Sequence, residues 1–383
     1  MTAVFTGADH RFMARALRLA ERGLYTTDPN PRVGCVLVRG GRQVVGAGWH
    51  RKAGEPHAER LALAQAGVEA RDATAYVTLE PCSHHGRTPP CADALIEAGV
   101  ARVVAAMRDP NPLVAGRGLA RLREAGIETQ VGLLEAEAAA LNRGFLQRLQ
   151  HGRPYLRCKL AMSLDGRTAM ASGESQWITG EDARRDVQLL RARSSAILTG
   201  VGTVLADDPS LNVRLPVQEL FGVEGDDPLR QPLRVVLDTR LRTAPRARML
   251  GLPGDTLIIC GDGAPADTEI ELRAAGADVA RLPQLGGRLD LAKVMTLLAD
   301  RGVNELLVEA GPTLAGSLLQ AGLVDELIVY VAPHLMGHAA RGLVGLPGLE
   351  RMDQRIELAL RAVRQVGRDL RLSYAPLIRC GID

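Results

Sequence analysis

Two short stretches hold residues whose types and spacing are suited to metal chemistry. In EPHAERLALA, His57 lies two residues before Glu59, and in LEPCSHHGRTPPCADAL, Cys82 and Cys91 each follow a proline. Zinc prefers nitrogen and sulfur ligands in a tetrahedral array, and a catalytic zinc takes three protein ligands and keeps one position for water. His57, Cys82 and Cys91 would supply those ligands. Glu59 would then stand near the open position, where a carboxylate can move protons between water and a departing amine.

The His-x-Glu and Pro-Cys pattern is the signature of zinc nucleobase deaminases. In that signature two residues separate the cysteines, whereas eight separate them here, and the intervening SHHGRTPP adds His84 and His85 as competing ligands. A structural zinc with four protein ligands is the alternative interpretation, and it would leave Glu59 without a task. We expect the catalytic site, in which Cys91 begins a helix whose N-terminus favours a thiolate.

The flanking patterns predict alternating helices and strands that would position these residues. Apolar runs such as VGCVLV and RVVAAM predict strands, and helical periodicity covers about residues 9–23, 57–66, 91–98, 118–126 and 135–149. Gly152 and Pro154 then break the pattern. We therefore expect two domains, 1–152 and 153–383.

The second half begins a new series of strands and helices and ends in an antiparallel pair of strands, which predicts an α/β domain. It has no Walker A sequence, and GVGTVL at Gly200 lacks the third glycine of the dinucleotide fingerprint. Two strand–turn–helix units remain, one at Gly200–Thr203 and one at Gly311–Thr313 after Glu309. Each would present backbone N–H groups to an anion, and together they could hold a dinucleotide. Either turn alone is equally compatible with a structural role.

The composition fits an ordinary globular protein and excludes several partners. Hydrophobic residues make up 46%, charged residues 24% and aromatic residues 3%, with a net charge of +3, so neither a nucleic acid nor a membrane is an expected partner. Lysine occurs only at Lys52, Lys159 and Lys293, and arginine, which suits phosphate, supplies the other positive charges. The opening MTAVFTGADHRF lacks the apolar region of a signal peptide, so we expect a cytoplasmic protein with reduced thiols.

Four motifs of the first half resemble the deaminase half of the bifunctional riboflavin-biosynthesis deaminase/reductase family: TTDPNPRVGCVLV, AGEPHAE, TLEPCSHHGRTPPCADALI and DPNPLVAGRGL. The long cysteine spacer is that family's own form of the motif. The resemblance implies a cytidine-deaminase-like α/β/α domain that uses Zn²⁺ to remove the 2-amino group of a phosphoribosylamino-diaminopyrimidinone. It also implies candidate substrate-binding residues, for each of which turn or loop chemistry is an alternative: Asn30, His84, Arg87, Asp109 and Asn111.

The second half resembles the reductase half of the same family in KLAMSLDGRTA, SGESQWIT, GVGTVLADDPSL and VEAGPTLAGSLL. This implies a dihydrofolate-reductase-like α/β domain that reduces the ribosylamino group to ribitylamino with NADPH. The NADPH contacts that it implies are Ala161, Trp177, Thr203, Asp207, Thr239, Gly311, Pro312, Thr313, Leu314, Ala315, Gly316 and Ser317. The implied substrate contacts are Ser175, Arg191, Leu211, Arg214 and Glu309.

Two roles in the second half stay open at the level of sequence. Arg191 and Arg214 suit the 5′-phosphate, because a charge-assisted fork to phosphate is a strong contact, but each could be a solvated surface charge. The reduction needs a proton donor near the opened sugar, and Lys159 and Glu309 are both candidates. We expect a bifunctional enzyme that acts on small-molecule phosphoribosylaminopyrimidines as a homo-oligomer, a dimer or a tetramer. The alternative is a zinc nucleobase deaminase with a non-catalytic second domain.

Overall fold

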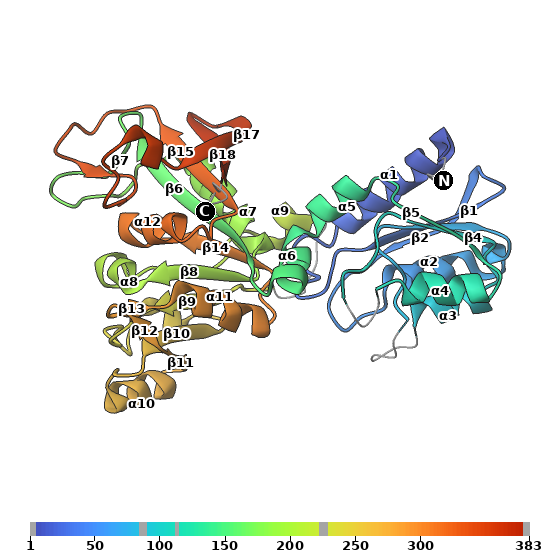
Figure 1. Cartoon of the computed structure of the whole chain (residues 1–383), viewed down its shortest axis with the longest axis horizontal. Helices are drawn as coiled ribbons and strands as arrows, with labels where there is room; N and C mark the ends of the chain where they lie inside the picture. The colour runs from blue at the N-terminus through green and yellow to red at the C-terminus, as the bar shows by residue number, and fades with distance from the viewer. Residues whose placement is uncertain (1–4, 84–89, 112–114, 222–228, 378–383) are drawn as a thin grey trace. The chain divides into compact units, whose positions relative to one another are not determined.

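The computed structural model describes residues 5–83, 90–111, 115–221 and 229–377. The chain forms two compact units, Met1–His151 and Gly152–Asp383, which are coloured blue to green and green to red in Figure 1. Each unit has its own sheet and its own buried apolar core. No helix within the described ranges is both long and apolar enough to cross a membrane.

The first unit is a five-stranded sheet with helices on both faces. Its strands lie in the order β2-β1-β3-β4-β5, with β1 antiparallel to β2 and β3, and with β3, β4 and β5 parallel. The elements are α1 (Gly7–Glu21), β1 (Gly34–Arg39), β2 (Gln43–Trp49), α2 (Ala58–Ala66), β3 (Thr74–Val77), α3 (Cys91–Glu97), β4 (Arg102–Ala105), α4 (Arg117–Glu124), β5 (Glu128–Val131), α5 (Glu135–Leu141) and α6 (Arg143–His151), with a short 3₁₀ helix at Gly67–Ala70.

Glycines let two helices pack directly on the sheet. A Cβ atom on Gly46 would lie 2.1 Å from the carbonyl oxygen of Ala62 in α2, and one on Gly34 would lie 2.0 Å from that of Ala16 in α1. Gly46 pairs with Leu37 and Gly34 with Trp49, so the two glycines point to opposite faces of the sheet. The helix that begins beside His57 therefore lies tightly against one face, while α1 covers the other.

The strand directions bring separate segments to one edge of this sheet. Strands β2, β3 and β4 run the same way, because β1 is antiparallel to both β2 and β3 and because β3 is parallel to β4. The segments that follow these three strands therefore leave the sheet at one edge, where the chain also enters β1. Ligands of open α/β sheets bind at such an edge.

One predicted helix is wrong in the first unit. Periodicity predicts a single helix over about 135–149, but the structure divides it into α5 and α6 at Asn142. The Asn142 side chain is buried and forms two hydrogen bonds with the backbone of Arg32, at 2.8 and 2.9 Å. The break between α5 and α6 therefore accompanies the Asn142–Arg32 contact, which helical periodicity cannot predict.

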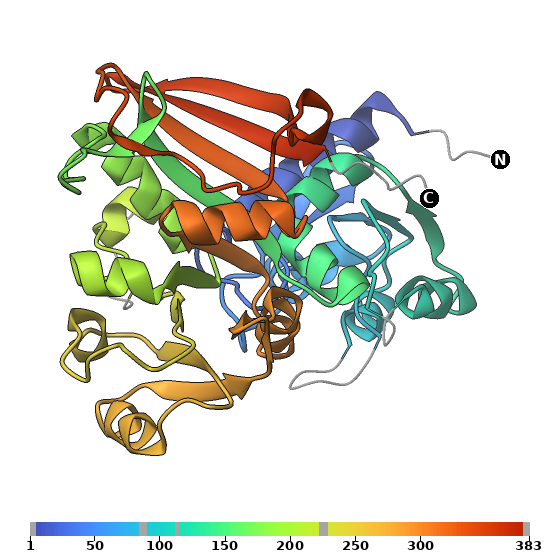
Figure 2. The same ribbon diagram turned by 60° about the vertical axis from the view of Figure 1, so that its left-hand side comes forward.

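The second unit has a nine-stranded mixed sheet in the order β11-β10-β9-β8-β14-β6-β15-β18-β17. Strands β17 and β18 form the predicted antiparallel pair, coloured red in Figure 2, and β18 is also antiparallel to β15. The elements are β6 (Tyr155–Ser163), β7 (Arg167–Ala169), α7 (Glu181–Arg193), β8 (Ala196–Gly200), α8 (Val201–Asp207), α9 (Val217–Phe221), β9 (Leu233–Leu237), β10 (Thr256–Gly261), α10 (Ala266–Ala274), β11 (Asp278–Leu282), β12 (Gln284–Leu285), β13 (Arg288–Leu289), α11 (Leu291–Asp300), β14 (Glu305–Glu309), α12 (Pro312–Gln320), β15 (Glu326–Ala332), β16 (Arg341–Gly342), β17 (Glu357–Val366) and β18 (Asp369–Leu377), with 3₁₀ helices at Arg248–Gly251 and Met352–Gln354.

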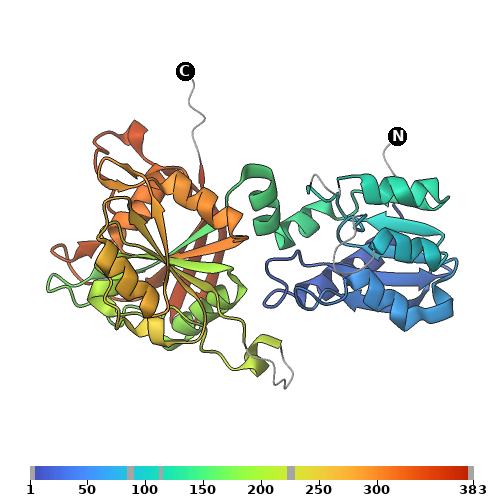
Figure 3. The same ribbon diagram turned by 90° about the horizontal axis from the view of Figure 1, so that it is seen from below.

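Helices cover both faces of the second sheet, as Figure 3 shows for the green-to-red unit. Alternate strand residues divide between two cores: Leu198 packs with residues of α11 and α12, whereas Ile197 packs with residues of α7 and α10. The parallel strands β8, β9 and β14 end at Gly200, Leu237 and Glu309 on one edge. The turns predicted to face an anion follow β8 and β14 at this edge.

Two candidate active sites

Three potential metal ligands meet at the edge of the first sheet. His57 immediately precedes α2, Cys82 follows β3, and Cys91 is the first residue of α3. The His57 Nδ1 atom lies 3.6 Å from Cys82 Sγ and 3.3 Å from Cys91 Sγ. Tetrahedral zinc with ordinary Zn–N and Zn–S bonds would place such atoms about 3.6 Å apart. Of the residues that the structure describes, these three form the cluster whose geometry could hold a metal ion.

The two cysteines contact each other, and their surroundings favour the thiolate at Cys82. The backbone N–H of Cys91, at the start of α3, donates to Cys82 Sγ at 3.3 Å. Hydrogen bonding from the Cys91 side chain lowers the pKa of the Cys82 thiol, and the same contact raises the pKa of Cys91. The pair therefore shares a proton that a bound dication would displace.

Glu59 lies beside the cluster in the first turn of α2 and is 3% exposed. Burial raises the pKa of Glu59 to about 7, because desolvation disfavours the charged carboxylate. A carboxyl group with this pKa can both accept and release a proton near neutral pH. The structure thus places the predicted proton carrier in the same enclosed region as the three candidate ligands.

His50 is a site residue that the sequence analysis missed. It is buried just after β2, and its ring lies edge-on to the His57 ring, with the centroids 5.3 Å apart. The Asn30 side-chain nitrogen lies 3.0 Å from His50 Nε2, and His50 Nδ1 lies 3.3 Å from the carbonyl oxygen of Pro56. Since that carbonyl can only accept, Nδ1 carries the ring proton and Nε2 accepts from Asn30. The strand end GAGWH was the available signal for this residue.

The remaining substrate candidates of the first unit divide into two groups. His84 and Arg87 lie outside the described residues. Asp109 and Asn111 follow β4 at the edge described above, and the backbone N–H of Asn111 donates to the Asp109 carboxylate at 2.9 Å. Both belong to a loop held by Glu80, a second residue that the sequence analysis did not select.

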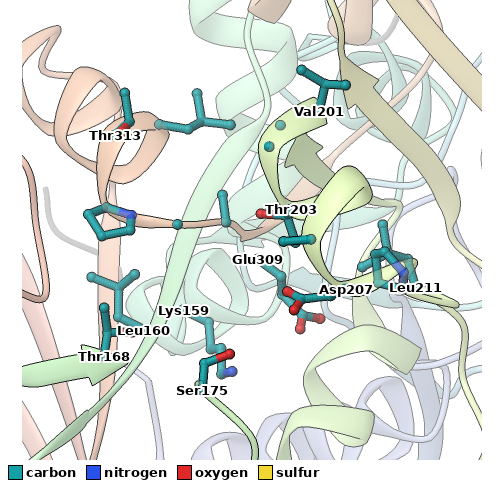
Figure 4. Close-up of a pocket in the computed structure, with 18 of the residues that line it drawn as sticks. Lys159, Leu160, Thr168, Ser175, Val201, Thr203, Asp207, Leu211, Glu309 and Thr313 are labelled. Carbon is teal, nitrogen blue, oxygen red and sulfur yellow. The ribbon is translucent and has the colours of Figure 1, made fainter. Parts of the chain in front are cut away.

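The second unit contains a cavity of about 1170 Å³ at the carboxyl edge of its sheet. Figure 4 shows Lys159 and Glu309 entering it from neighbouring strands, with Thr203 and Asp207 on α8 and Thr313 on α12. The predicted substrate residues that line it are Ser175, Arg191, Leu211, Arg214 and Glu309. The predicted cofactor residues that line it are Ala161, Trp177, Thr203, Asp207, Thr239, Gly311, Pro312, Thr313, Leu314 and Ser317.

Two further predicted cofactor residues, Ala315 and Gly316, are not among the residues that line the cavity and pack behind it on α12. Ala315 is fully buried in the apolar core, and a Cβ atom on Gly316 would lie 1.8 Å from the Gly345 carbonyl oxygen. Trp177 behaves differently from a core residue, because it is 66% exposed and carries the Arg184 guanidinium 4.8 Å from its ring centroid. The cavity wall therefore includes an exposed aromatic surface.

The cavity holds a pair of opposite charges on adjacent strands. Lys159 of β6 and Glu309 of β14 are direct partners in the parallel ladder. The Arg191 guanidinium donates to both Glu309 oxygens, at 2.6 and 3.0 Å, and to the backbone oxygen of Asn212 at 3.0 Å. Burial alone would raise the pKa of Glu309, but Arg191 holds it below its usual range, and burial lowers the pKa of Lys159.

Comparison with known proteins defines the class of each unit. The family model of the cytidine and deoxycytidylate deaminase zinc-binding region matches residues 6–107, and that of the RibD C-terminal domain matches residues 154–372. The first unit is therefore a deaminase domain of the zinc-binding kind, and the second is a reductase domain with the predicted α/β fold. Full-length relatives then identify the family.

The chain is 56% identical to the riboflavin biosynthesis protein RibD of Escherichia coli (strain K12) over 369 residues, which cover 94% of this chain and 98% of that protein. It is 52% identical to the RibD of Haemophilus influenzae over 97% of this chain and 98% of that protein. The structure of Acinetobacter baumannii RibD, form 1, has a TM-score of 0.88 at 47% identity and covers 97% of this chain and 99% of that one. This chain belongs to the RibD family of bifunctional riboflavin-biosynthesis enzymes, and the alternative of a non-catalytic second domain is not favoured.

A further solved structure, from Thermotoga maritima, is named as a diaminohydroxyphosphoribosylaminopyrimidine deaminase/5-amino-6-(5-phosphoribosylamino)uracil reductase. It has a TM-score of 0.82 at 31% identity and covers 97% of this chain and 99% of that chain. The predicted combination of hydrolase and oxidoreductase domains in one polypeptide is thus confirmed.

Proposed function

We propose that this chain carries out two consecutive reactions on a phosphoribosylaminopyrimidine. The first unit, Met1–His151, deaminates 2,5-diamino-6-(5-phosphoribosylamino)pyrimidin-4-one by hydrolysis. The second unit, Gly152–Asp383, uses NADPH to reduce 5-amino-6-(5-phosphoribosylamino)uracil to its ribityl form. The observation that carries this proposal is the convergence of His57, Cys82 and Cys91 beside the buried Glu59, in a chain whose other unit has a charged cavity large enough for a dinucleotide and a sugar phosphate.

In the deaminase, His57, Cys82 and Cys91 would hold zinc, which when bound lowers the pKa of water so that it attacks at neutral pH. Glu59 takes the proton that this water loses as it adds to the ring carbon bearing the 2-amino group. Glu59 then delivers that proton to the departing nitrogen, which leaves as ammonia, and the ring keeps the new oxygen. Asn30 donates one N–H to His50, whose ring lies beside His57, and its second N–H can donate to the edge of the pyrimidine.

In the reductase, NADPH would supply a hydride for C1′ of the opened ribose, and the protein must supply one proton. Glu309 is the poorer donor, because its contact with Arg191 keeps it ionised. Lys159 lies beside it and carries a proton that burial makes easier to release. We therefore assign the proton transfer to Lys159, and to Glu309 the task of holding the charged partners in place.

Replacing Lys159 by Gln tests this assignment. The reductase kcat should fall about 10²-fold, as expected for loss of a general acid, with a smaller change in the KM for NADPH. The measurement is the steady-state oxidation of NADPH with the deaminated substrate. The Lys293→Gln variant changes a lysine on α11 that lies outside the cavity wall of the described chain and should behave as the parent does. Equal activity of the Lys159→Gln variant would transfer the role to another group.

The 5′-phosphate should be held chiefly by Arg214. This side chain is exposed at the cavity wall, whereas the Arg191 guanidinium is engaged by Glu309 and Asn212. Arg214→Ala should raise the reductase KM for the phosphorylated substrate about tenfold, since a charge-assisted contact is lost. A dephosphorylated substrate should show no such change, and a similar rise with that analogue would refute the phosphate assignment. Arg361→Ala, on the exposed face of β17, is the matched control.

A coupled assay tests the function as a whole. The purified chain receives the phosphoribosyl diaminopyrimidinone and NADPH, and ammonia release and NADPH absorbance are followed with and without a zinc chelator. We expect both signals without chelator and neither with it. Adding the deaminated intermediate to the chelated enzyme should restore NADPH oxidation alone. Ammonia release that survives complete removal of zinc would refute the metal-dependent first step.

We further propose that the chain works in the cytoplasm as a dimer or a tetramer. The edge strand β17 exposes Leu360 and Val363, which are 55% and 54% accessible. Such an edge is a template for pairing with another strand. Light scattering at micromolar concentration should give the mass of a dimer or larger species, and a monomer would contradict the proposal.

A further inference from the structure

A single buried carboxylate ties together two segments of the deaminase. Glu80 is 3% exposed and follows β3, two residues before Cys82. Its Oε2 atom accepts the backbone N–H groups of Asp109 at 3.3 Å and Gly116 at 3.0 Å. Its Oε1 atom accepts those of Gly118 at 3.0 Å and Leu119 at 3.2 Å. Such a group of four donors requires an acceptor-only side chain with two oxygens.

Two of these contacts complete the N-terminus of α4. Gly116 is the N-cap of this helix and has no side chain that could accept from the first turn. Glu80 supplies the missing acceptor from a distant segment, because Gly118 and Leu119 hold the second and third positions of the helix. A negative charge is also favourable at a helix N-terminus. The start of α4 is therefore defined by a residue 38 positions away in the sequence.

The other two contacts hold the segment that follows β4 and the residue that precedes α4. Glu80 Oε2 accepts from Asp109, two residues before Asn111, and from Gly116. Asn111 N–H donates to the Asp109 carboxylate at 2.9 Å, and Ala115 N–H donates to the Asn111 carbonyl oxygen at 2.9 Å. The segment that holds the two candidate substrate residues is thus tied at Asp109 to the same carboxylate as the start of α4.

A steric contact locks the same two segments together. A Cβ atom on Gly118 would lie 1.9 Å from the carbonyl oxygen of Pro81, which is far inside contact distance. The first turn of α4 therefore rests against the backbone between Glu80 and Cys82, and only glycine permits this approach. Because the two segments touch through both Glu80 and Gly118, the position of the loop relative to Cys82 is set here.

We propose that Glu80 is a positioning residue of the deaminase, which sets the loop of Asp109 and Asn111 against the Cys82 segment so that the loop can bind the pyrimidine substrate. The proposal rests on the deaminase function proposed above. Glu80 acts through the loop and not on the reacting atoms, so its loss weakens substrate binding more than it slows the chemical step. Loss of binding shared by ground state and transition state raises KM and leaves kcat nearly unchanged.

The Glu80→Gln variant tests the proposal in the full-length chain. Glutamine keeps the shape of glutamate but has one accepting oxygen. Its NH₂ group would face two backbone N–H groups from which it cannot accept a hydrogen bond. Because charged hydrogen bonds are lost, the deaminase KM should rise about tenfold or more. The kcat should stay within about threefold of the parent value. Zinc content and reductase activity on the deaminated substrate should not change. Glu124→Gln, an exposed change at the other end of α4, is the matched control and should match the parent.

A second variant reaches the same contact without touching the carboxylate. Gly118→Ala should push α4 away from Pro81 and raise the deaminase KM with zinc retained. If the Glu80→Gln variant keeps the parental KM, the proposal is overturned. It is also overturned if this variant loses both zinc and kcat, because Glu80 would then support the metal site. If Glu80→Gln does not fold, a parental KM in Gly118→Ala overturns it. Absence of ammonia release by the parent chain would instead refute the deaminase function itself.

Discussion

Replacing Glu59 by Gln should reduce ammonia release about 10³-fold while zinc remains bound, since general acid–base catalysis contributes on the order of 10²–10⁴-fold. Glu59 is 3% exposed, so bulk water can hardly reach the site to transfer protons in its place. Glutamine has nearly the same shape and adds no charge, and the candidate ligands His57, Cys82 and Cys91 are untouched. The variant thus separates the proton carrier from the metal site.

The measurement is ammonia release from the diaminopyrimidinone, together with zinc content by atomic emission. Reductase activity on the deaminated substrate provides a control within the same molecule and should be unchanged. A second control is Glu69→Gln, which removes a surface carboxylate 46% exposed and paired with Arg39. Parental turnover in the Glu59→Gln variant would refute the proton-carrier role.

Replacing Cys82 by Ser should remove zinc and, with it, deaminase activity. A serine hydroxyl does not ionise near neutral pH, and its oxygen is a poorer ligand than a thiolate for zinc. The remaining His57 and Cys91 cannot form a closed three-ligand set. Loss of a ligand should weaken zinc binding at least as much as loss of a supporting contact, which costs about 10–100-fold.

Zinc content after dialysis and the rate of ammonia release measure this effect, and both should fall together. Cys35→Ala changes a buried cysteine of β1 in the same unit and should retain zinc. Added zinc at high concentration should restore part of the Cys82→Ser activity if only affinity is reduced. A full zinc complement in Cys82→Ser at ordinary concentrations would remove Cys82 from the ligand set.

Together these two variants decide between a catalytic and a structural zinc. A structural site with a fourth protein ligand would lose stability in Cys82→Ser but would leave Glu59→Gln active. His84 and His85, the competing ligands suggested by the sequence, lie outside the described residues. Among the described residues, the metal cluster consists of His57, Cys82 and Cys91. Three protein ligands would leave the fourth position of a tetrahedral zinc open for water.

Sequence reasoning found the groups whose chemistry is specific to their residue type. Histidine, cysteine and glutamate at fixed spacing have few other uses in a chain of this kind, so the cluster at His57 could be predicted from residue type and spacing alone. The helix starting at Cys91 and the terminal strand pair could likewise be predicted, because their apolar periods are local. The single helix over 135–149 was wrong, because the burial of Asn142 against Arg32 is a contact across 110 positions.

Sequence reasoning did not find the residues whose role depends on a distant partner. His50 ends the GAGWH strand and Glu80 lies two residues before Cys82, but neither local pattern shows the distant groups that each side chain contacts. Likewise, no local pattern indicated that the Arg191 guanidinium donates to Glu309, 118 positions away. That contact decided between Lys159 and Glu309 in our assignment of the proton donor.

Residue types and local patterns were enough to predict the chemistry available to this protein: a thiolate and imidazole ligand set with a carboxylate beside it, and a second α/β half with anion-facing turns. They were enough because ligand identity and hydrophobic period are properties of neighbouring residues. The tertiary structure alone decided which of these groups meet. Strand order and direction bring His50, Glu80 and Asp109 to one edge and pair Lys159 with Glu309, since hydrogen bonds between strands join residues that the chain keeps far apart.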